Sequence, residues 1–323
     1  MTTHRRVDLS RVRTISIAKR KSKVSRGDFA APFDDAADSF AAFAAGLPRV
    51  LAADDLRAIT EAIVSSRRKN KPVLLMMGAH VIKVGLAPVI IDLLRRGVVT
   101  AVAMNSAAAI HDVETAMWGH TSEDVAVNMK DGRFGMARET GEFINRTLSL
   151  AAASGDDGYA EALARELIAR KAPNIDVSLL ASCFTHGVPA TVHAAIGTDI
   201  VHQQPTMNGA ATGEMTFRDF LSLCQTCKGL TGGGVVLNVG SAVIMPEVFL
   251  KALTVARNLG ARARGFTTAV FDMNAHYRPA MNVKSRPTQD GGKGYYVIGH
   301  HEIMFPLLAA MITSRMRAHT DSR

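Results

Sequence analysis

The sequence predicts an α/β protein with a doubly wound, mostly parallel, Rossmann-like sheet and helices on both faces of that sheet. Short and nearly continuous apolar runs recur along the chain, and such runs are typical of strands buried on both faces. Segments with helical spacing of apolar residues lie between the runs. Alternation of strands and helices builds parallel βαβ units, which predicts an open parallel sheet.

The apolar runs assign the strands one by one, beginning with KPVLLMM. The predicted strands are residues 71–77, 98–104, 189–195, 234–240, 265–272 and 294–299. Helical periodicity and start signals, such as Pro246 in a first turn, assign the helices. The predicted helices are a short one within 34–51, then 53–68, 81–96, 106–117, two within 134–171 separated by SGDDG, then 216–227, 246–258 and 302–316.

Composition indicates a soluble cytoplasmic protein without a membrane partner. The chain has 323 residues, of which 47% are hydrophobic, so it is long enough for a sizeable core. No apolar run reaches the roughly 18 residues of a membrane span. The three cysteines leave at least one unpaired, which fits a reducing compartment better than a disulfide framework.

The positive charge is concentrated at the N-terminus. Residues 1–26 hold nine Lys or Arg against one acid, Asp8, and so carry +8 of the net +9. The rest of the chain is nearly neutral, which argues against a nucleic-acid-binding body. The leader is either a solvated tail or a segment that binds an acidic surface or a neighbouring subunit. We therefore expect a basic extension over 1–34, one α/β domain over 35–318, and a tail over 319–323.

Small and polar residues follow the predicted strands at their carboxyl ends, where open α/β sheets bind ligands. They are Gly78, Ala79 and His80; Asn105, Ser106 and Ala107; Gly240 and Ser241; Asp272, Met273 and Asn274; and Gly299, His300, His301 and Glu302. Free N–H groups at a helix start suit a phosphate, although helix capping alone also explains Asn105 and Ser106. No GxGxxG motif is present, so spacing alone is weak evidence for a dinucleotide.

The stretch MNSAAAIHDVETAMWGHTSED (104–124) combines a floor of small residues with a row of ionisable groups. These groups are His111, Asp112, Glu114, His120, Glu123 and Asp124. A ligand crevice with charged groups behind it is the interpretation that we favour. Trp118, in the same stretch, is expected to pack in the core.

Other constellations give weaker signals. Asp199 and His202 are three residues apart with His193 upstream, but no HExxH or Cys/His cluster occurs, and we expect no metal. Cys224 and Cys227 form a CxxC inside a predicted helix, which favours two core thiols.

Two lysines fall in the most loop-like part of the body, residues 275–294. Lys284 and Lys293 are either surface lysines or imine-forming nucleophiles, and a desolvated lysine suits the second role. The loop is long enough to fold over the crevice as a lid, and its glycines would permit that motion.

The segment GAHVIKVGLAPVIIDLLRRGVVTAVAMNSAAAIHDVE resembles the first βαβ unit of deoxyhypusine synthases. FTTAVFD and HHEIMFPLLAA resemble later segments of that family, and the resemblance runs in order from about residue 70 to 315. The first segment also resembles the ornithine-cyclodeaminase domain of bifunctional arginine-degrading enzymes, which has a related NAD-binding fold.

The resemblance implies an NAD-dependent transfer of an aminobutyl group from a polyamine such as spermidine, through a lysine imine, to an amine or to an acceptor protein. It implies a homotetramer. The implied cofactor-binding residues, with Ser241 added from the strand ends, are Ala79, His80, Ser106, Ala107, Gly240, Ser241, Thr268, Ala269 and His300. The implied catalytic residues are Asp272 and Lys284, and Asp112 and Asp199 are the expected substrate-binding acids.

The sequence departs from the family at its signature residues. The paired histidines after the glycine-rich strand end are replaced by Met245 and Pro246, and the Trp-Gly-Lys motif is missing. Two alternatives therefore stay open: an ornithine-cyclodeaminase-like lyase that uses NAD, and a non-catalytic NAD-binding or scaffold protein.

Overall fold

The computed structural model describes residues 6–35 and 39–317, and the backbone of 318–320. The chain divides into two compact units, Met1–Asp54 and Asp55–Arg323. The first unit extends past residue 34, where the sequence analysis placed the end of the basic extension. Each unit is described by itself below.

The first unit consists of short turns and one small helix. Three 3₁₀ turns, Leu9–Arg11, Ile17–Lys19 and Arg26–Asp28, are separated by extended backbone, and helix α1 spans Phe40–Gly46. The rings of Phe33 and Phe43 meet edge to face with centroids 6.0 Å apart. Large apolar side chains before residue 34 stay exposed: Val7, Leu9, Val12, Ile15, Ile17, Val24, Phe29 and Phe33.

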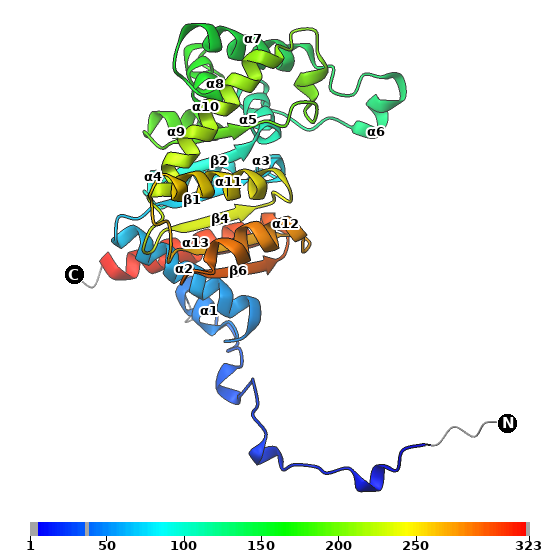
Figure 1. Cartoon of the computed structure of the whole chain (residues 1–323), viewed down its shortest axis with the longest axis vertical. Helices are drawn as coiled ribbons and strands as arrows, with labels where there is room; N and C mark the ends of the chain where they lie inside the picture. Colours follow the sequence, from blue (N-terminus) through cyan, green and yellow to red (C-terminus); the bar gives the residue numbers. More distant parts are fainter. Residues whose placement is uncertain (1–5, 36–38, 321–323) are drawn as a thin grey trace, which may run out of the picture. The chain divides into compact units, whose positions relative to one another are not determined.

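The second unit is built on a six-stranded parallel sheet with the order β3-β2-β1-β4-β5-β6 (Figure 1). The strands are β1 Val73–Met77, β2 Ala101–Asn105, β3 Ala190–His193, β4 Val235–Val239, β5 Thr267–Asp272 and β6 Lys293–Ile298. All six predicted strands are confirmed, and so is the fold class. This is the strand order of the doubly wound Rossmann fold. Strands β1 to β3 are added toward one edge of the sheet and β4 to β6 toward the other, so the order reverses between β1 and β4.

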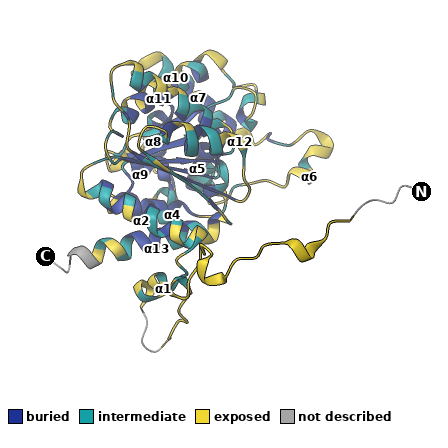
Figure 2. Cartoon of the chain, turned by 60° about the horizontal axis from the view of Figure 1, so that its bottom comes forward, coloured by how far each residue is buried: buried dark blue, intermediate teal, exposed yellow. Residues whose placement is uncertain are grey.

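Helices cover both faces of this sheet, as Figure 2 shows by burial. The helices of the chain after α1 are α2 Leu51–Arg68, α3 Ala79–Lys83, α4 Ala87–Arg95, α5 Ser106–Trp118, α6 Val125–Asn128, α7 Arg138–Ser154, α8 Tyr159–Ala169, α9 Leu179–Thr185, α10 Gly209–Lys228, α11 Ile244–Asn258, α12 Tyr277–Pro279 and α13 His301–Thr320. Helix α4 contacts both α9 and α13, whereas α10 and α11 pack together on the opposite face.

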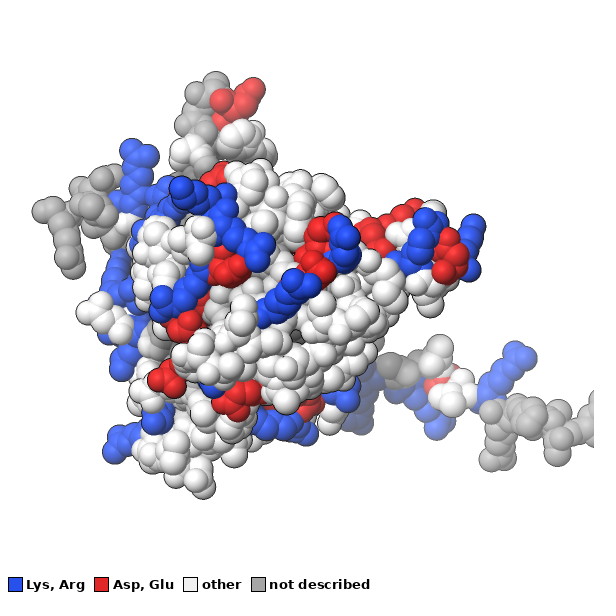
Figure 3. All heavy atoms as spheres, turned by 90° about the horizontal axis from the view of Figure 1, so that it is seen from above, with Lys and Arg blue, Asp and Glu red and all other residues white. Residues whose placement is uncertain are grey.

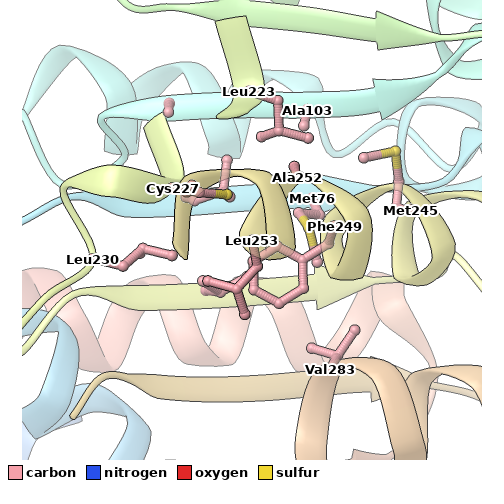
Figure 4. Packing of buried hydrophobic residues seen from close by; sticks show 14 of the residues in the cluster. Met76, Ala103, Leu223, Cys227, Leu230, Met245, Phe249, Ala252, Leu253 and Val283 are labelled. Carbon is pink, nitrogen blue, oxygen red and sulfur yellow. The ribbon is translucent and has the colours of Figure 1, made fainter. Parts of the chain in front are cut away.

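One hydrophobic core cluster lies between the sheet and helices α10 and α11 (Figure 4). Phe249 and Leu253 of α11 pack against strand residues such as Met76, and all three are almost fully buried. Cys224 and Cys227 of α10 belong to the same cluster as free thiols, which confirms the interpretation of the CxxC as core thiols.

Residues 275–294 do not form a lid, and that prediction is wrong. They form α12, the π-helical turn η7 (Ala280–Ser285) and the 3₁₀ turn η8 (Arg286–Thr288), which together make the crossover from β5 to β6. The turn η7 contacts β5, β6 and α11, and Val283 is fully buried in the core cluster of α10 and α11 (Figure 4). Core packing therefore holds the segment against the sheet.

The outer edge of β3 is closed by side chains of α10. The backbone N–H of Val192 donates to Asp219, at 2.6 Å from Oδ2, and the carbonyl of Val192 accepts from the Thr216 hydroxyl at 3.0 Å. The N–H of Ala194 donates to the same Thr216 oxygen at 2.9 Å. The backbone groups of Val192 and the N–H of Ala194, which point away from β2, are therefore satisfied, which protects this part of the edge strand.

An arm, residues 119–137, projects from the body of the second unit and carries α6 (Figure 1). Its two legs are joined by Glu123, which accepts from the backbone N–H of Gly135 at 2.8 Å and from the Asn128 amide at 2.9 Å. Val125, Val127 and Met129 are exposed on the arm. The arm is thus a braced element with an apolar surface.

The surface of the second unit carries both signs of charge. Lysine and arginine side chains lie among aspartate and glutamate side chains on the face in Figure 3. Pairs one helical turn apart occur on α7 and α8, such as Arg146–Glu142 and Arg165–Glu161. Among the described residues, no helix has the length and apolar character needed to span a membrane.

Candidate functional site

The residues that follow the strands lie at one edge of the sheet, because all six strands run in parallel. Strands β1 and β4 are neighbours at the switch point, where doubly wound folds bind ligands. The predicted residues that lie at a strand end or just beyond it are Ala79, His80, Ser106, Ala107, Gly240, Ser241, Asp272 and His300. Thr268 and Ala269 lie instead inside β5 and are fully buried, so the strand shields them from this edge.

Two glycines bring the ends of β1 and β4 into backbone contact. A Cβ on Gly78 would lie 2.0 Å from the carbonyl oxygen of Gly240, so a side chain cannot fit there. Gly240 has φ +65°, and a Cβ on it would lie 3.0 Å from Cε1 of His301. The imidazole of His301 therefore occupies the side of Gly240, an expected cofactor-binding residue, on which a Cβ would lie. The glycines provide a backbone surface without side chains at the switch point.

A histidine pair flanks this surface. The rings of His80 and His301 meet edge to face, with centroids 5.6 Å apart. Burial, with the charge of His301 as a second cause, lowers the pKa of His80. His301 is buried, its Nε2 lies 3.2 Å from the carbonyl oxygen of Phe271, and its Nδ1 has no partner. His300, the histidine expected to bind the cofactor, is exposed, and its neighbour His301 is the one that lies beside Gly240.

Asp272 ends β5 beside the same cluster. Its Oδ1 accepts from the Met273 N–H at 2.8 Å and lies 3.8 Å from Nε2 of His276. Ser241 is occupied locally, because its hydroxyl accepts from the N–H of Met245 at 3.1 Å in the first turn of α11. Asp272 therefore remains a candidate at the edge, whereas the hydroxyl of Ser241 is bonded to the backbone of α11.

A cleft of about 910 Å³ opens between α5, the arm, the start of α7 and the loop after β3. Four carboxylates line it together with two basic residues, two histidines and a tryptophan. These are Glu114, Glu123, Glu139 and Asp199; Lys83 and Arg133; His111 and His120; and Trp118. Trp118 was expected in the core, but it is half-buried in this lining. The balance of charge favours a cationic ligand.

The α5 side of the cleft follows helical periodicity. Ala107, His111, Glu114 and Trp118 recur at intervals of three and four residues and share one face of the helix. Of the ionisable residues in 104–124, His111, Glu114, His120 and Glu123 line the cleft, whereas Asp112 and Asp124 do not. Glu139, by contrast, was missed, because nothing in its own helix marks it.

Hydrogen bonds fix Glu114 in place. Its carboxylate accepts from the hydroxyls of Thr121 and Thr140, the latter at 3.0 Å. Nδ1 of His111 lies 2.6 Å from the Thr121 oxygen. Burial lowers the pKa of His111, and the carboxylate of Glu114 opposes that effect. The cleft thus presents an acid whose position is set from both the arm and α7.

Asp199 lies where the cleft meets the first turn of α5. Its carboxylate accepts a short hydrogen bond from the hydroxyl of Ser106. Nε2 of His202 is 3.8 Å from its Oδ2. Burial raises the pKa of Asp199, while Ser106 and His202 act in the opposite direction. Of the two expected substrate-binding acids, Asp199 is the one in the cleft.

Asp112, the other expected substrate-binding acid, faces away from the cleft. It is fully buried and accepts from the Ser178 hydroxyl at 2.7 Å and from the N–H groups of Leu179 and Leu180 at 2.6 and 3.2 Å. Burial raises its pKa to about 6, against the effect of these hydrogen bonds. Asp112 therefore ties α5 to the start of α9, because it lies one residue off the stripe that faces the cleft.

Lys284 lies at the wrong end of the sheet for the predicted imine chemistry. A Cβ on Gly294 would lie 2.1 Å from the carbonyl oxygen of Lys284, so this lysine packs beside the beginning of β6. Gly294 is four residues before the end of the strand, or about 13 Å along it. Lys293 is the first residue of β6. Of the lysines in the part of the chain that the structure describes, only Lys83 lines the cleft.

A metal centre receives no support from the geometry. Among the described residues, no group of three or more His, Cys, Asp or Glu side chains could hold a metal ion. The pair Asp199–His202 is instead a reciprocal capping box of the 3₁₀ turn η6 (Ile200–Gln203).

The chain is thus an α/β protein with a Rossmann-type sheet and an acidic cleft at its carboxyl edge. No protein-family model matches it, and no curated protein matches its sequence. Among solved structures it is similar to AgrE in a ternary complex with ornithine and NAD⁺ (TM-score 0.52, 15% identity). It is also similar to ArgZ, an arginine dihydrolase from the ornithine–ammonia cycle in Cyanobacteria (TM-score 0.50, 18% identity).

These matches extend over most of this chain but over only part of the other proteins. The alignments cover 83% and 81% of this chain and 33% and 31% of the AgrE and ArgZ chains, so this chain spans about a third of their length. A protein assigned as a deoxyhypusine synthase from Entamoeba histolytica aligns over 87% of this chain and 96% of its own, at TM-score 0.49 and 10% identity. At these identities the comparisons show the fold alone.

Proposed function

We propose that the protein is an NAD-dependent enzyme that oxidises an amine or an amino acid at the carboxyl edge of its sheet. The observation that carries the proposal is the acidic cleft, which meets the first turn of α5 at Ser106 and Asp199. Its volume lies in the range of small-molecule sites. The sequence resemblance to enzymes that act on polyamines or ornithine points to the same class.

The cleft suits an alkylammonium group. Glu114, Glu123, Glu139 and Asp199 outnumber Lys83 and Arg133 in its lining. Trp118 adds a ring face, which attracts cations within about 6 Å of its centre. Because Glu114 is held by Thr121 and Thr140, the cation would meet a carboxylate that is already oriented. Little ordering would then be required on binding.

The residues at the sheet edge fit the cofactor. The contact between Gly78 and Gly240 leaves backbone without side chains at the switch point, and α5 begins with small residues from Ser106 to Ala109. Ala79, His80 and Asp272 would border a dinucleotide laid along this edge, and Ser106 would reach it from the next strand. When bound, NAD supplies the acceptor for the hydride that leaves the amine carbon.

Asp199 is the base that we assign to the reaction. An alkylammonium ion must lose a proton before the carbon beside it can be oxidised. Burial raises the pKa of Asp199, which makes it a better proton acceptor than an exposed carboxylate. Its place between the cleft and Ser106 puts it between the expected amine and the expected cofactor.

The position of the lysines separates the two candidate outcomes of this oxidation. Transfer of an aminobutyl group through an enzyme imine needs a lysine at the reacting carbon. Lys284 and Lys293 lie at the beginning of β6, and Lys83 is the lysine of the cleft. We therefore place an ornithine-cyclodeaminase-like reaction, which releases ammonia, beside aminobutyl transfer as a second candidate.

The test is NADH formation from NAD⁺ with spermidine, putrescine, ornithine and lysine offered singly. We expect one of these amines to reduce NAD⁺, and we expect Asp199→Asn to lower kcat/KM about 100-fold, as for loss of a general base. Glu142→Gln is the matched control, because Glu142 is a partly exposed acid of α7 that pairs with Arg146 outside the cleft. Ammonia release distinguishes deamination from transfer.

If no amine reduces NAD⁺, calorimetric measurement of NAD⁺ binding distinguishes the remaining explanations. Binding without turnover of any amine would favour the non-catalytic alternative. Absence of both binding and turnover would show that the proposed function is wrong.

We also propose, from the resemblance, that the protein is a homo-oligomer, with a tetramer expected. The apolar side chains of Val125, Val127 and Met129 on the arm are a surface that assembly would cover. Light scattering should then give a mass well above the 34.6 kDa of one chain. A monomer at micromolar concentration would contradict the proposal.

A further inference from the structure

Three hydrogen-bonding side chains from three elements lie around the carboxylate of Asp199. Ser106 of α5 donates to it, and His202 of η6 faces it at 3.8 Å. Tyr159 of α8 is fully buried and makes no hydrogen bond to Asp199; burial raises its pKa first, and the charges of Asp199 and Asp219 raise it further. The side chains of Asp199 and His202 are about 5% exposed, so water has little access to either.

The tautomer of His202 follows from its backbone contacts. Nδ1 accepts from the N–H of Gly197 at 3.1 Å and from the N–H of Asp199 at 3.2 Å. A nitrogen that accepts two N–H groups carries no proton, so the proton of the neutral ring lies on Nε2. The capping box therefore aims an N–H group at the carboxylate of Asp199.

This N–H group has no hydrogen-bond partner. Nε2 of His202 and the hydroxyl of Tyr159 are both buried and unpaired. Buried donors rarely stay unpaired, because an unmade hydrogen bond in the interior costs the desolvation of the group. A shift of the carboxylate by about 1 Å would bring His202 within hydrogen-bonding distance.

We propose that His202 is a positioning residue for Asp199: its Nε2–H holds the buried carboxylate ionised and oriented toward the cleft. The inference deepens the proposed function, because it rests on Asp199 as the base. Ser106 and His202 both face Oδ2 of Asp199, so after the shift that oxygen would accept from two donors. The loop after β3 thus supplies both the base and the group that supports it.

Other groups around the cleft bear on the charge of Asp199. Lys83 of α3, Glu114 of α5 and Glu139 of α7 line the same cleft as Asp199, and a nearby cation favours an ionised carboxylate whereas nearby acids oppose it. Asp199 and Asp219 of α10 both raise the pKa of Tyr159. These groups are the same in the variants below, so a difference between those variants reports on His202.

The test is the titration of the Asp199 side chain by the ¹³Cγ chemical shift in substrate-free protein, assigned with Asp199→Asn. His202→Asn keeps an acceptor near the position of Nδ1, but its shorter side chain places no donor at the position of Nε2. We expect it to shift the titration of Asp199 to higher pH and to weaken the binding of putrescine about tenfold at neutral pH, as for the loss of one hydrogen bond to a charge. His202→Gln restores a donor and fits the capping box, so it should stay within about twofold of the wild type.

The matched control is His186→Asn, since His186 bonds to the carbonyl of Ser182 in α9, outside the cleft. A folded His202→Asn variant in which Asp199 titrates at the wild-type pH would overturn the proposal. If that variant does not fold, the proposal is tested by the ¹H chemical shift of the His202 Nε2–H proton, compared between the wild type and Asp199→Asn. It should move upfield in Asp199→Asn, and an unchanged shift overturns the proposal. These readouts need neither NAD⁺ nor turnover, so their failure is distinct from failure of the proposed function.

Discussion

Replacing Gly78 with alanine is expected to lower the free energy of unfolding by about 3 kcal/mol or more, at the upper end of overpacking effects. The new Cβ would lie 2.0 Å from the carbonyl oxygen of Gly240 and 2.8 Å from its carbonyl carbon. Both neighbours are backbone atoms, which cannot rotate away as a side chain can. The ends of β1 and β4 would have to separate. Urea unfolding measures the effect, and a fall in Tm on the order of 6 °C should accompany it.

Gly213→Ala is the control for this substitution. Gly213 lies within α10, and a Cβ on it would meet no atom within 4 Å. Alanine is favoured over glycine in a helix interior by about 1 kcal/mol, so this variant should be as stable as the wild type or more stable. A Gly78→Ala protein with wild-type stability would show that the two strand ends are not packed as described.

Asp219→Ala should also destabilise the fold strongly, by about 3 kcal/mol at pH 5. Asp219 accepts from the N–H groups of Ala160 and Val192 at 3.0 and 2.6 Å, and it is almost fully buried. Its removal leaves two buried donors without an acceptor, each of which costs about 1–3 kcal/mol. Asp219→Asn, which keeps one acceptor oxygen, should lose less. Equal stability of the alanine variant and the wild type at pH 5 would contradict this account.

The loss caused by Asp219→Ala should shrink as the pH rises. Burial raises the pKa of Asp219 from 3.8 to about 7, against the effect of its backbone hydrogen bonds. A carboxyl whose pKa is higher in the folded than in the unfolded protein contributes its full stability below about pH 4 and loses it as pH rises through about 7. A rise of about three units corresponds to at most about 4 kcal/mol.

Differences between the Asp219 variants isolate this contribution. His193 has the opposite dependence, because burial lowers its pKa to about 3 and protonation then favours the unfolded chain. That background is common to wild type and variants, so it cancels in their difference. Chemical denaturation at pH 5 and pH 8 is the measurement, and a difference that does not change between the two would show that Asp219 does not titrate in this range.

The strands could be predicted from the sequence because their burial leaves a direct trace. A strand covered on both faces must be apolar at every position, and β1 is fully buried from Val73 to Met77. The chain order of strands and helices then defined the fold class. One predicted helix, 81–96, is two helices, α3 and α4. The break lies at Gly85, which has φ +79°. A single glycine in an apolar stretch does not reveal from the sequence that it adopts this conformation.

The candidate site could be predicted only as far as local rules reach. The predicted strand ends placed Ser106 and Gly240 at the edge of the sheet. Helical spacing could have shown that His111 and Glu114 lie on the cleft face of α5 and that Asp112 does not. What Asp112 and Lys284 contact depends on α9 and β6, which are distant in the sequence. Only the tertiary structure shows that one acid caps a helix and that the lysine lies at the other end of the sheet.

The sealed edge of β3 has a consequence for how copies of this protein can meet in a crowded solution. A bare strand edge is a template on which another chain can add a strand, and that addition starts many aggregates. Thr216 and Asp219 occupy the hydrogen-bonding positions of Val192 and Ala194 that an incoming strand would need. Two side chains, one helical turn apart on α10, thus block the addition of a strand from another molecule at this edge of the sheet.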